Sequence, residues 1–216
     1  MNPTVSGVIF VTTRTKGTRE KVTREAATLL YSEVEKEYKQ AKLKAAKTFG
    51  LHYMPTNLEV AIELDKIAEE NEGPARIDRL IRMRKEALRI MELLRKYDPI
   101  LVGSVWRGTI HHRSDLDIIV HHEEPKEVAK TIQQTDLNIE RIESATVVKH
   151  GKKKEHVHIH IESPIKEKVE VIVHSPEEVC LKEKCEIYGD EIKGLRLEEL
   201  EKLLKDNPDQ RFVPES

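Results

Sequence analysis

The sequence predicts a mixed α/β (α+β) fold, in which a mixed β-sheet core is flanked by helices and preceded by a helical N-terminal region. Two patterns along the chain predict it. In the first 97 residues, apolar side chains recur every three or four positions, which is typical of amphipathic helices. After Asp98-Pro99, short runs of β-branched residues alternate with turn residues, which is typical of strands.

The change of pattern also predicts the domain organisation. We expect residues 1–97 to form an N-terminal strand and a helical accessory region, residues 98–178 to form the sheet-containing core, and residues 179–216 to form a C-terminal helical tail. A chain of 216 residues suffices for one core domain with such an accessory part.

The accessory region begins with Gly7–Thr12, a β-branched and aromatic run that predicts a short strand. A long amphipathic helix is expected from about Lys21 to Thr48. The turn residues Pro55–Asn57 separate it from a second helix at about Leu58–Glu70 and a third at about Ala75–Tyr97.

Short strands and two or three helices are expected in the remainder of the chain. The expected strands are 100–102, 116–120, 146–148, 157–161 and 169–173, and two of them form a hairpin around the basic turn Gly151–Lys154. The expected helices run from about 124 to 134, from Ser175–Glu178 onward, and from about 195 to 204.

Composition limits the class of protein. Charged residues make up 35% and apolar residues 38% of the chain, and the formal net charge is −2, so any basic patch for nucleic acid must be local. No run approaches the ~20 apolar residues of a membrane span, and we expect a cytoplasmic protein without a signal peptide. Cys180 and Cys185 lack a second cysteine pair, so we expect two reduced thiols.

The segment after the strand 100–102 has the residues of a phosphate-binding turn. Gly103 lets the backbone approach a phosphate closely, and Ser104 adds a hydroxyl and its N–H. A helical turn over Val105–Thr109 would point its positive N-terminus at an anion. Arg107 and Gly108 could make further phosphate contacts, although Arg107 could equally be an ordinary surface arginine.

Two carboxylates follow in Ser114-Asp115-Leu116-Asp117. Because side chains alternate along a strand, Asp115 and Asp117 face one side while Leu116 packs behind. Mg²⁺ prefers oxygen ligands, so paired carboxylates at the start of a strand predict a metal site. The simpler alternative is a capping aspartate followed by a surface strand.

The joint pattern carries a family resemblance. Gly103–Gly108 and Ser114–Val120, separated by five residues, resemble the signature of the DNA polymerase β-like nucleotidyltransferase superfamily, in its minimal archaeal-type form. That signature is an apolar residue, Gly, Gly or Ser, three residues and Gly, then a gap and Ser-Asp-apolar-Asp followed by three apolar residues. The match covers Ile100–Val120, and the rest of the core is similar in strand order only.

The resemblance implies an activity and a site. A nucleoside monophosphate would pass from an NTP to an acceptor hydroxyl, with release of pyrophosphate, in the presence of Mg²⁺ or Mn²⁺. Asp115 and Asp117 would hold the metal and act in catalysis. The nucleotide would be bound by Gly103, Ser104, Arg107, Gly108 and Ser114.

The resemblance also implies a third carboxylate on a later strand. We expect Glu170, because a glutamate between β-branched residues of an apolar strand must compensate its burial. The superfamily often has Asp at this position, so Glu is a departure. Glu162 is the alternative.

Other polar clusters have competing interpretations. His156, His158 and His160 share one strand face, which indicates either a zinc or acid–base site or the solvated face of a sheet. Lys152–Lys154 and the polar segment Thr12–Arg19 could contact RNA or simply be solvated.

We therefore expect a metal-dependent nucleotidyltransferase whose partners are an NTP and an acceptor, with RNA slightly favoured. The alternative is a weak or inactive module of this fold that acts by binding RNA or a protein, as an antitoxin-like partner would. The sequence predicts no membrane contact and leaves the acceptor, the preferred NTP and the oligomeric state open.

Overall fold

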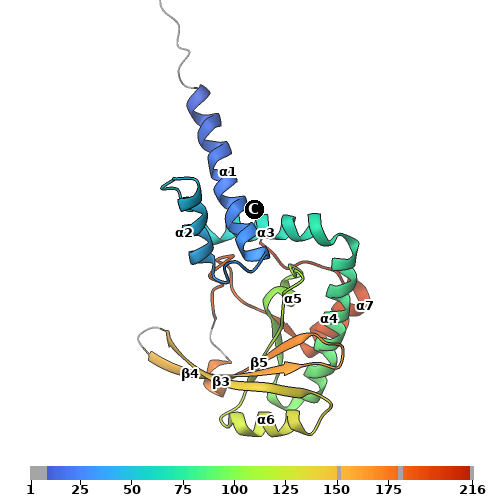
Figure 1. Ribbon diagram of the computed structural model, residues 1–216. Coiled ribbons are helices and arrows are strands. Elements are labelled where there is room, and N and C mark those ends of the chain that lie inside the picture. The colour runs from blue at the N-terminus through green and yellow to red at the C-terminus, as the bar shows by residue number, and fades with distance from the viewer. Residues whose placement is uncertain (1–8, 150–151, 180–181, 215–216) are drawn as a thin grey trace, which may run out of the picture. The chain divides into compact units, whose positions relative to one another are not determined.

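The computed structural model describes residues 9–149, 152–179 and 182–214, with the backbone alone for 9–16, 147–149 and 152–155. Two compact units divide the chain: Met1–Gly73 with Glu186–Tyr188, and Pro74–Cys185 with Gly189–Ser216. The first is helical and the second contains a mixed sheet (Figure 1), which confirms the predicted fold class.

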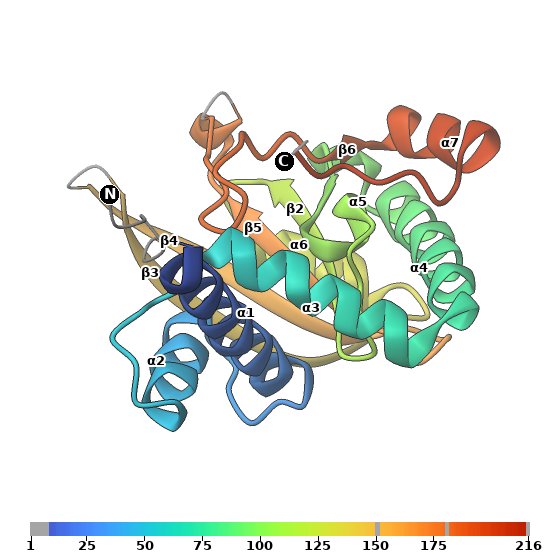
Figure 2. The same ribbon diagram turned by 90° about the horizontal axis from the view of Figure 1, so that it is seen from above.

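The N-terminal unit contains α1 (Ile9–Tyr31), α2 (Tyr38–Thr48) and α3 (Asn57–Glu72). Their mutual packing is visible in Figures 1 and 2, and its core is rich in alanine, which allows close approach of the helices. The start of α3 is fixed by a capping box, because the Thr56 hydroxyl accepts from the Glu59 N–H at 3.1 Å and the Thr56 N–H donates to Glu59 Oε2 at 2.7 Å.

Two predictions for this unit were wrong. Residues 9–12 of the expected Gly7–Thr12 strand belong to α1, and residues 7 and 8 lie outside the described part. A strand needs a partner, whereas β-branched residues cost a helix only a few tenths of a kcal/mol each. The expected helix Lys21–Thr48 is broken after Tyr31, where Glu33 has a φ of +56°, so that α2 folds back and buries its alanine face against α1.

The second unit contains the remaining elements. They are α4 (Pro74–Leu93), η1 (Arg95–Tyr97), β1 (Ile100–Val102), α5 (Gly103–Arg107), β2 (Leu116–His121), α6 (Pro125–Gln133), β3 (Asn138–Lys149), β4 (Lys152–Glu162), β5 (Lys168–His174), η2 (Pro176–Glu178), β6 (Leu195–Arg196) and α7 (Leu197–Asp206). The described strands form a six-stranded sheet in the order β3-β4-β5-β2-β1-β6, in which β2 and β5 are parallel and the other neighbours antiparallel.

The division between the units falls at Gly73–Pro74, whereas the sequence places a boundary at residues 97–98. The reason is the packing of α4. Its residues Leu80, Met83 and Ile90 are buried in the same hydrophobic cluster as the strands of the sheet. Residues 189–216 also join this unit, so they are not a separate C-terminal tail.

Three boundaries in this unit differ from the sequence prediction. Leu195–Arg196 pairs with the edge of β1, so the last helix begins at Leu197. The segment after Ser175 forms a single 3₁₀ turn instead of an α-helix. The hairpin strand β3 begins at Asn138, well before the expected strand 146–148. The sequence did not reveal its first half, because β3 is an edge strand whose charged side chains conceal the period-two pattern.

The sheet has one apolar and one polar face. In β2, Leu116, Ile118 and Val120 are buried against a core that includes residues of α4 and α6. The alternate residues Asp117 and His121 project from the opposite face, which is therefore the face available for chemistry. Among the described residues, no helix has the length and apolar character needed to cross a membrane.

A buried arginine ties α4 to the segment that follows β1. Arg84 is fully buried, and its guanidinium donates to four backbone carbonyls, those of Val105 at 3.0 Å, Trp106 at 2.8 Å, Pro208 at 2.8 Å and Gln210 at 2.9 Å. Burial lowers the pKa of Arg84 to about 10, so the group stays protonated at neutral pH. Arg84 thereby fixes α5 and the C-terminal segment together.

Replacing this guanidinium should destabilise the second unit. We expect Arg84→Lys to lower the free energy of unfolding by about 2–4 kcal/mol, because an ammonium cannot reach all four carbonyls and leaves buried acceptors unpaired. The fluorescence of Trp106, the single tryptophan, reports this unit during urea unfolding. Arg82→Lys, an exposed change on the same helix, should stay within about 0.5 kcal/mol, and an equal effect of the two changes would contradict the assignment.

Candidate functional site

Three carboxylates lie near one another on the polar face of the sheet. Asp115 lies directly before β2, Asp117 lies within β2, and Glu170 lies in β5. Asp117 and Glu170 are paired in the parallel register, so their side chains leave neighbouring strands on the same face. Neighbouring strands are about 4.8 Å apart. The structure thus places Asp115, Asp117 and Glu170 near enough to interact electrostatically. In the described part of the chain, however, their ligand atoms are not gathered within 4.8 Å of one another, as those of His156, His174 and Glu178 are.

The glycine after β1 packs directly against this cluster. Gly103 has a φ of +72°, and a Cβ at this position would collide with a carboxylate oxygen of Asp117. Val102 is the strand partner of Asp117. Only glycine therefore allows the turn Gly103-Ser104 to lie beside the carboxylate.

Electrostatics at the cluster are unfavourable for ionised carboxylates. Burial first, and then the charges of Glu170 and Asp115, raise the pKa of Asp117 to about 8. Burial also raises the pKa of Asp115; Lys168 opposes this shift and Glu170 adds to it. Such a cluster is stabilised by a bound cation, because the cation offsets the mutual repulsion of the carboxylates.

Two histidines orient Glu170. The Nδ1 atom of His158 lies 2.8 Å from Glu170 Oε1, and the Nε2 atom of His160 lies 3.6 Å from the same oxygen. The Nε2 atom of His160 is also 3.4 Å from Glu143 Oε2. These imidazoles therefore hold one oxygen of the predicted ligand, so His158 and His160 are not simply a solvated face. Glu162 instead pairs with Lys166 at 3.1 Å.

The turn before Asp115 is fixed from α4. Arg79 makes a bidentate ion pair with Glu167, at 3.0 and 2.6 Å, and also donates to the carbonyls of His111 at 2.7 Å and Ser114 at 3.1 Å. The Ser114 hydroxyl accepts from the His111 N–H at 2.9 Å. Ser114 thus shapes the turn that presents Asp115, a role that its place in the motif did not reveal.

Arg107 and Gly108 lie in a packed environment. The buried Arg107 pairs with Asp190 at 2.7 Å and donates to the Phe212 carbonyl at 3.0 Å. A Cβ at Gly108 would lie 3.2 Å from both the Gln210 carbonyl and the Arg211 side chain. The structure therefore places these two residues against the C-terminal segment and groups only Gly103, of the predicted glycines, with the carboxylates.

A cavity of about 650 Å³ extends along the polar face. Small-molecule sites commonly have volumes of ~300–1,000 Å³. Its lining includes Gly103, Ile119, His158 and Ile172 but none of the three carboxylates, which lie beside it. It is thus large enough for a nucleotide-sized ligand.

The far end of the cavity contains residues that sequence reasoning missed. His174 and Glu178 line it, together with His156. Burial first, and then the neighbouring His156, lower the pKa of His174 to about 4, so His174 is neutral at pH 7. The available signal was the period-two spacing of Glu170, Ile172 and His174, which places all three on one strand face.

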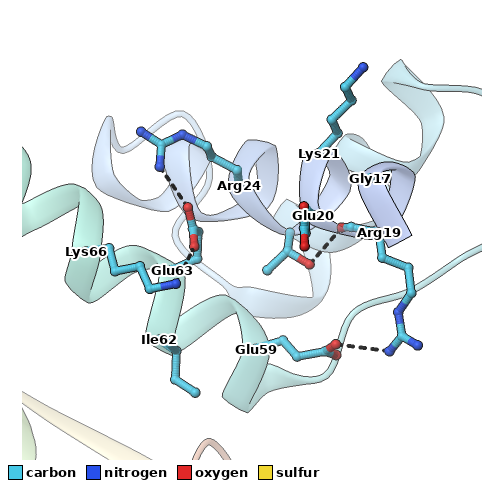
Figure 3. Close-up of a pocket in the computed structure, with 10 residues that line it drawn as sticks. Gly17, Arg19, Glu20, Lys21, Arg24, Glu59, Ile62, Glu63 and Lys66 are labelled. Atoms are coloured by element: carbon cyan, nitrogen blue, oxygen red, sulfur yellow. Dashed lines mark hydrogen bonds and ion pairs between the residues drawn. The ribbon is translucent and has the colours of Figure 1, made fainter. Parts of the chain in front are cut away.

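The N-terminal unit has a cavity of its own, of about 1000 Å³ (Figure 3). Three of the four cations that line it are paired with carboxylates: Arg19 with Glu59 at 3.0 Å, Arg24 with Glu63 at 2.8 Å and Lys66 with Glu63 at 3.4 Å. The segment Thr12–Arg19 belongs to α1 and does not follow a strand. Such pairing offsets the positive charge of these three groups and reduces their attraction for an RNA backbone.

Two predictions, the basic turn and the reduced thiols, concern residues that the structure does not fully describe. The side chains of Lys152–Lys154, at the predicted basic turn, lie outside the described part, as does Cys180.

The collision at Gly103 predicts a specific loss of stability. Gly103→Ala should cost more than Gly189→Ala, which shares the positive φ, +75°, but has open space around the added Cβ. We expect about 1–2 kcal/mol for the backbone in each variant and about 1–3 kcal/mol more at Gly103 from overpacking. Urea unfolding followed by Trp106 fluorescence measures the difference, and equal losses would argue against the close packing on Asp117.

The raised pKa of Asp117 predicts a pH dependence of stability without divalent metal. The folded pKa of about 8 exceeds the ordinary value of about 3.9, so the contribution of Asp117 is complete below pH ~4 and is lost as pH rises through 8. Asp117→Asn should therefore stabilise the second unit increasingly from pH 5 to pH 8.5. Asp136→Asn, at an exposed residue, serves as the control, and parallel pH profiles of wild type and Asp117→Asn would refute the prediction.

Comparison with known proteins places the site within a family. The family described as "Domain of unknown function (DUF4269)" matches residues 85–192, a segment that includes all three carboxylates and the histidine end of the cavity. No curated protein matches the sequence. Because the matched segment spans half of the chain, the protein belongs to the DUF4269 family.

Proposed function

We propose that the protein is a metal-dependent nucleotidyltransferase, which moves a nucleoside monophosphate from an NTP to an acceptor hydroxyl and releases pyrophosphate. The observation that supports the proposal is the position of Asp117, which lies against the Gly103 turn and opposite Glu170, with Asp115 directly before the same strand. Nucleotidyl transfer needs these two parts, a seat for divalent metal and a cradle for the triphosphate.

The donor set fits Mg²⁺ or Mn²⁺. The three residues offer oxygen ligands, which hard cations prefer. Their crowding and burial, which raise the pKa of Asp117, supply the reason for a cation to bind there. When bound, the metal neutralises charge on the triphosphate and polarises the transferring phosphoryl group.

The protein residues perform the positioning. The Gly103-Ser104 turn can direct its backbone N–H groups and the Ser104 hydroxyl at the triphosphate, because no Cβ separates Gly103 from Asp117. His158 holds the Glu170 carboxylate in one orientation, as Arg79 holds the turn before Asp115. Preorganisation of this kind avoids reorganisation during the reaction.

In the transfer step, one phosphorus–oxygen bond forms and another breaks. The oxygen of the acceptor hydroxyl forms a bond to the α-phosphorus, and the bond from that phosphorus to the bridging oxygen breaks. Pyrophosphate leaves with that electron pair. The hydroxyl proton passes to a carboxylate of the cluster, which acts as general base.

Substitution of the carboxylates tests the metal seat. Asp115→Asn, Asp117→Asn and Glu170→Gln should each weaken Mg²⁺-dependent binding of a fluorescent ATP analogue by about 100-fold or more, because each removes a charged ligand. Glu162→Gln, a matched change at the alternative third ligand, should leave binding within about 3-fold. Unchanged metal-linked binding in the Asp115/Asp117 double variant would refute the proposal, and loss only at Glu162 would move the third ligand.

A second experiment tests transfer and the acceptor. Four α-labelled NTPs are incubated with the protein, Mg²⁺ and either total RNA, cell protein or small amines and alcohols. We expect label on one class of acceptor, with RNA as the first candidate, and none with Asp117→Asn. If no acceptor, including the protein itself, is labelled in any combination, the chain is not a transferase but a binding module of this fold.

A further inference from the structure

A second cluster of ligand-type side chains lies on the polar face of the sheet. His156 in β4, His174 in β5 and Glu178 in η2 are 4%, 8% and 7% exposed, so all three are buried. Their nitrogen and oxygen ligand atoms lie within 4.8 Å of one another. Burial of three polar groups so close together costs free energy, which a shared ligand would offset.

The fold builds this cluster from three separate elements. Val157 pairs with Val173, so the neighbouring His156 and His174 lie side by side on the polar face. Their rings stack with centroids 3.9 Å apart and planes inclined by 14°. The Ser175 hydroxyl accepts from the Glu177 N–H at 3.4 Å and caps the 3₁₀ turn that carries Glu178 to within 3.2 Å of His156 Nε2.

We propose that His156, His174 and Glu178 bind one divalent transition-metal ion of the zinc class. Two imidazole nitrogens and one carboxylate oxygen form a three-ligand set of the type that leaves a fourth position open. Imidazole ligands favour such ions over Mg²⁺. All three residues line the 650 Å³ cavity, so the open position faces a space that admits water or a small ligand.

A neighbouring histidine supports a polar ligand at this end of the cavity. The ring of His121 lies 6.0 Å from that of His174, centroid to centroid. His121 Nδ1 is buried and has no hydrogen-bond partner within the described part of the chain. A buried polar atom without a partner costs free energy, and a water molecule on the bound ion would supply the partner.

The cluster is distinct from the carboxylate site. His174 lies four residues beyond Glu170 on β5, a distance of about 13 Å at the usual rise of a strand. One site offers only oxygen ligands, and the other mainly nitrogen. The inference therefore does not rest on the proposed nucleotidyltransferase activity.

Zinc binding by the full chain tests the proposal. After treatment with a chelator and dialysis, the protein is titrated with Zn²⁺ in competition with a chromogenic chelator. We expect one equivalent bound with a Kd below about 1 μM and a loss of about 100-fold or more in His174→Ala and in the isosteric Glu178→Gln. Millimolar Mg²⁺ should not compete.

Two controls separate this site from others. His52→Ala removes an exposed histidine of the helical unit, and the Asp115→Asn/Asp117→Asn double variant removes carboxylates of the other site. Both should bind Zn²⁺ as the wild type does. Circular dichroism verifies that each variant is folded.

The unfolding midpoint of the wild-type chain gives an independent readout, because an ion that binds only the folded state raises it. Should His174→Ala or Glu178→Gln fail to fold, this measurement decides alone. No zinc-dependent rise, unchanged affinity in folded Glu178→Gln, or loss of binding in the double aspartate variant would each overturn the proposal.

Discussion

The register of the parallel pair β2–β5 is the constraint on which the rest of the second unit depends. It pairs Asp117 with Glu170 on one face and Ile118 with Val171 on the other. A slip of one residue would turn Glu170 into the apolar core and expose the valines, so burial of the core and assembly of the site select the same register. The apolar core and the carboxylate cluster are therefore specified together by one pairing.

Helix α4 supplies the rigidity that the sheet alone cannot give. Arg76, Arg79 and Arg84 reach from its surface to backbone carbonyls between Val105 and Ser114. That segment contains one short helix and otherwise irregular backbone, whose carbonyls need donors. Three guanidinium groups on one helix thus hold the segment between β1 and β2 in place, and with it Gly103 and Asp115.

The polar face of the sheet contains two clusters of polar side chains, and both lower the stability of the fold. At one end Glu170 and Asp115 raise the pKa of the buried Asp117, while at the other end two imidazoles are stacked. Apolar side chains of similar volume would stabilise the fold more than either cluster does, because burial of polar groups costs free energy. A bound cation at each cluster would offset that cost. The carboxylates suit a cation that prefers oxygen ligands, and the imidazoles suit one that prefers nitrogen ligands.

The sequence by itself determined the local elements: the glycine turn at Gly103, the paired aspartates and the alternation that gives each strand a polar face. These depend on backbone preferences and on neighbours a few residues away. Tertiary structure decided what depends on partners distant in the chain. It packed α4 in the unit that contains the sheet, paired Arg107 with Asp190, and placed Glu178 beside His156. Only the strand register and the helix packing determine which distant side chains meet, and no local pattern encodes them.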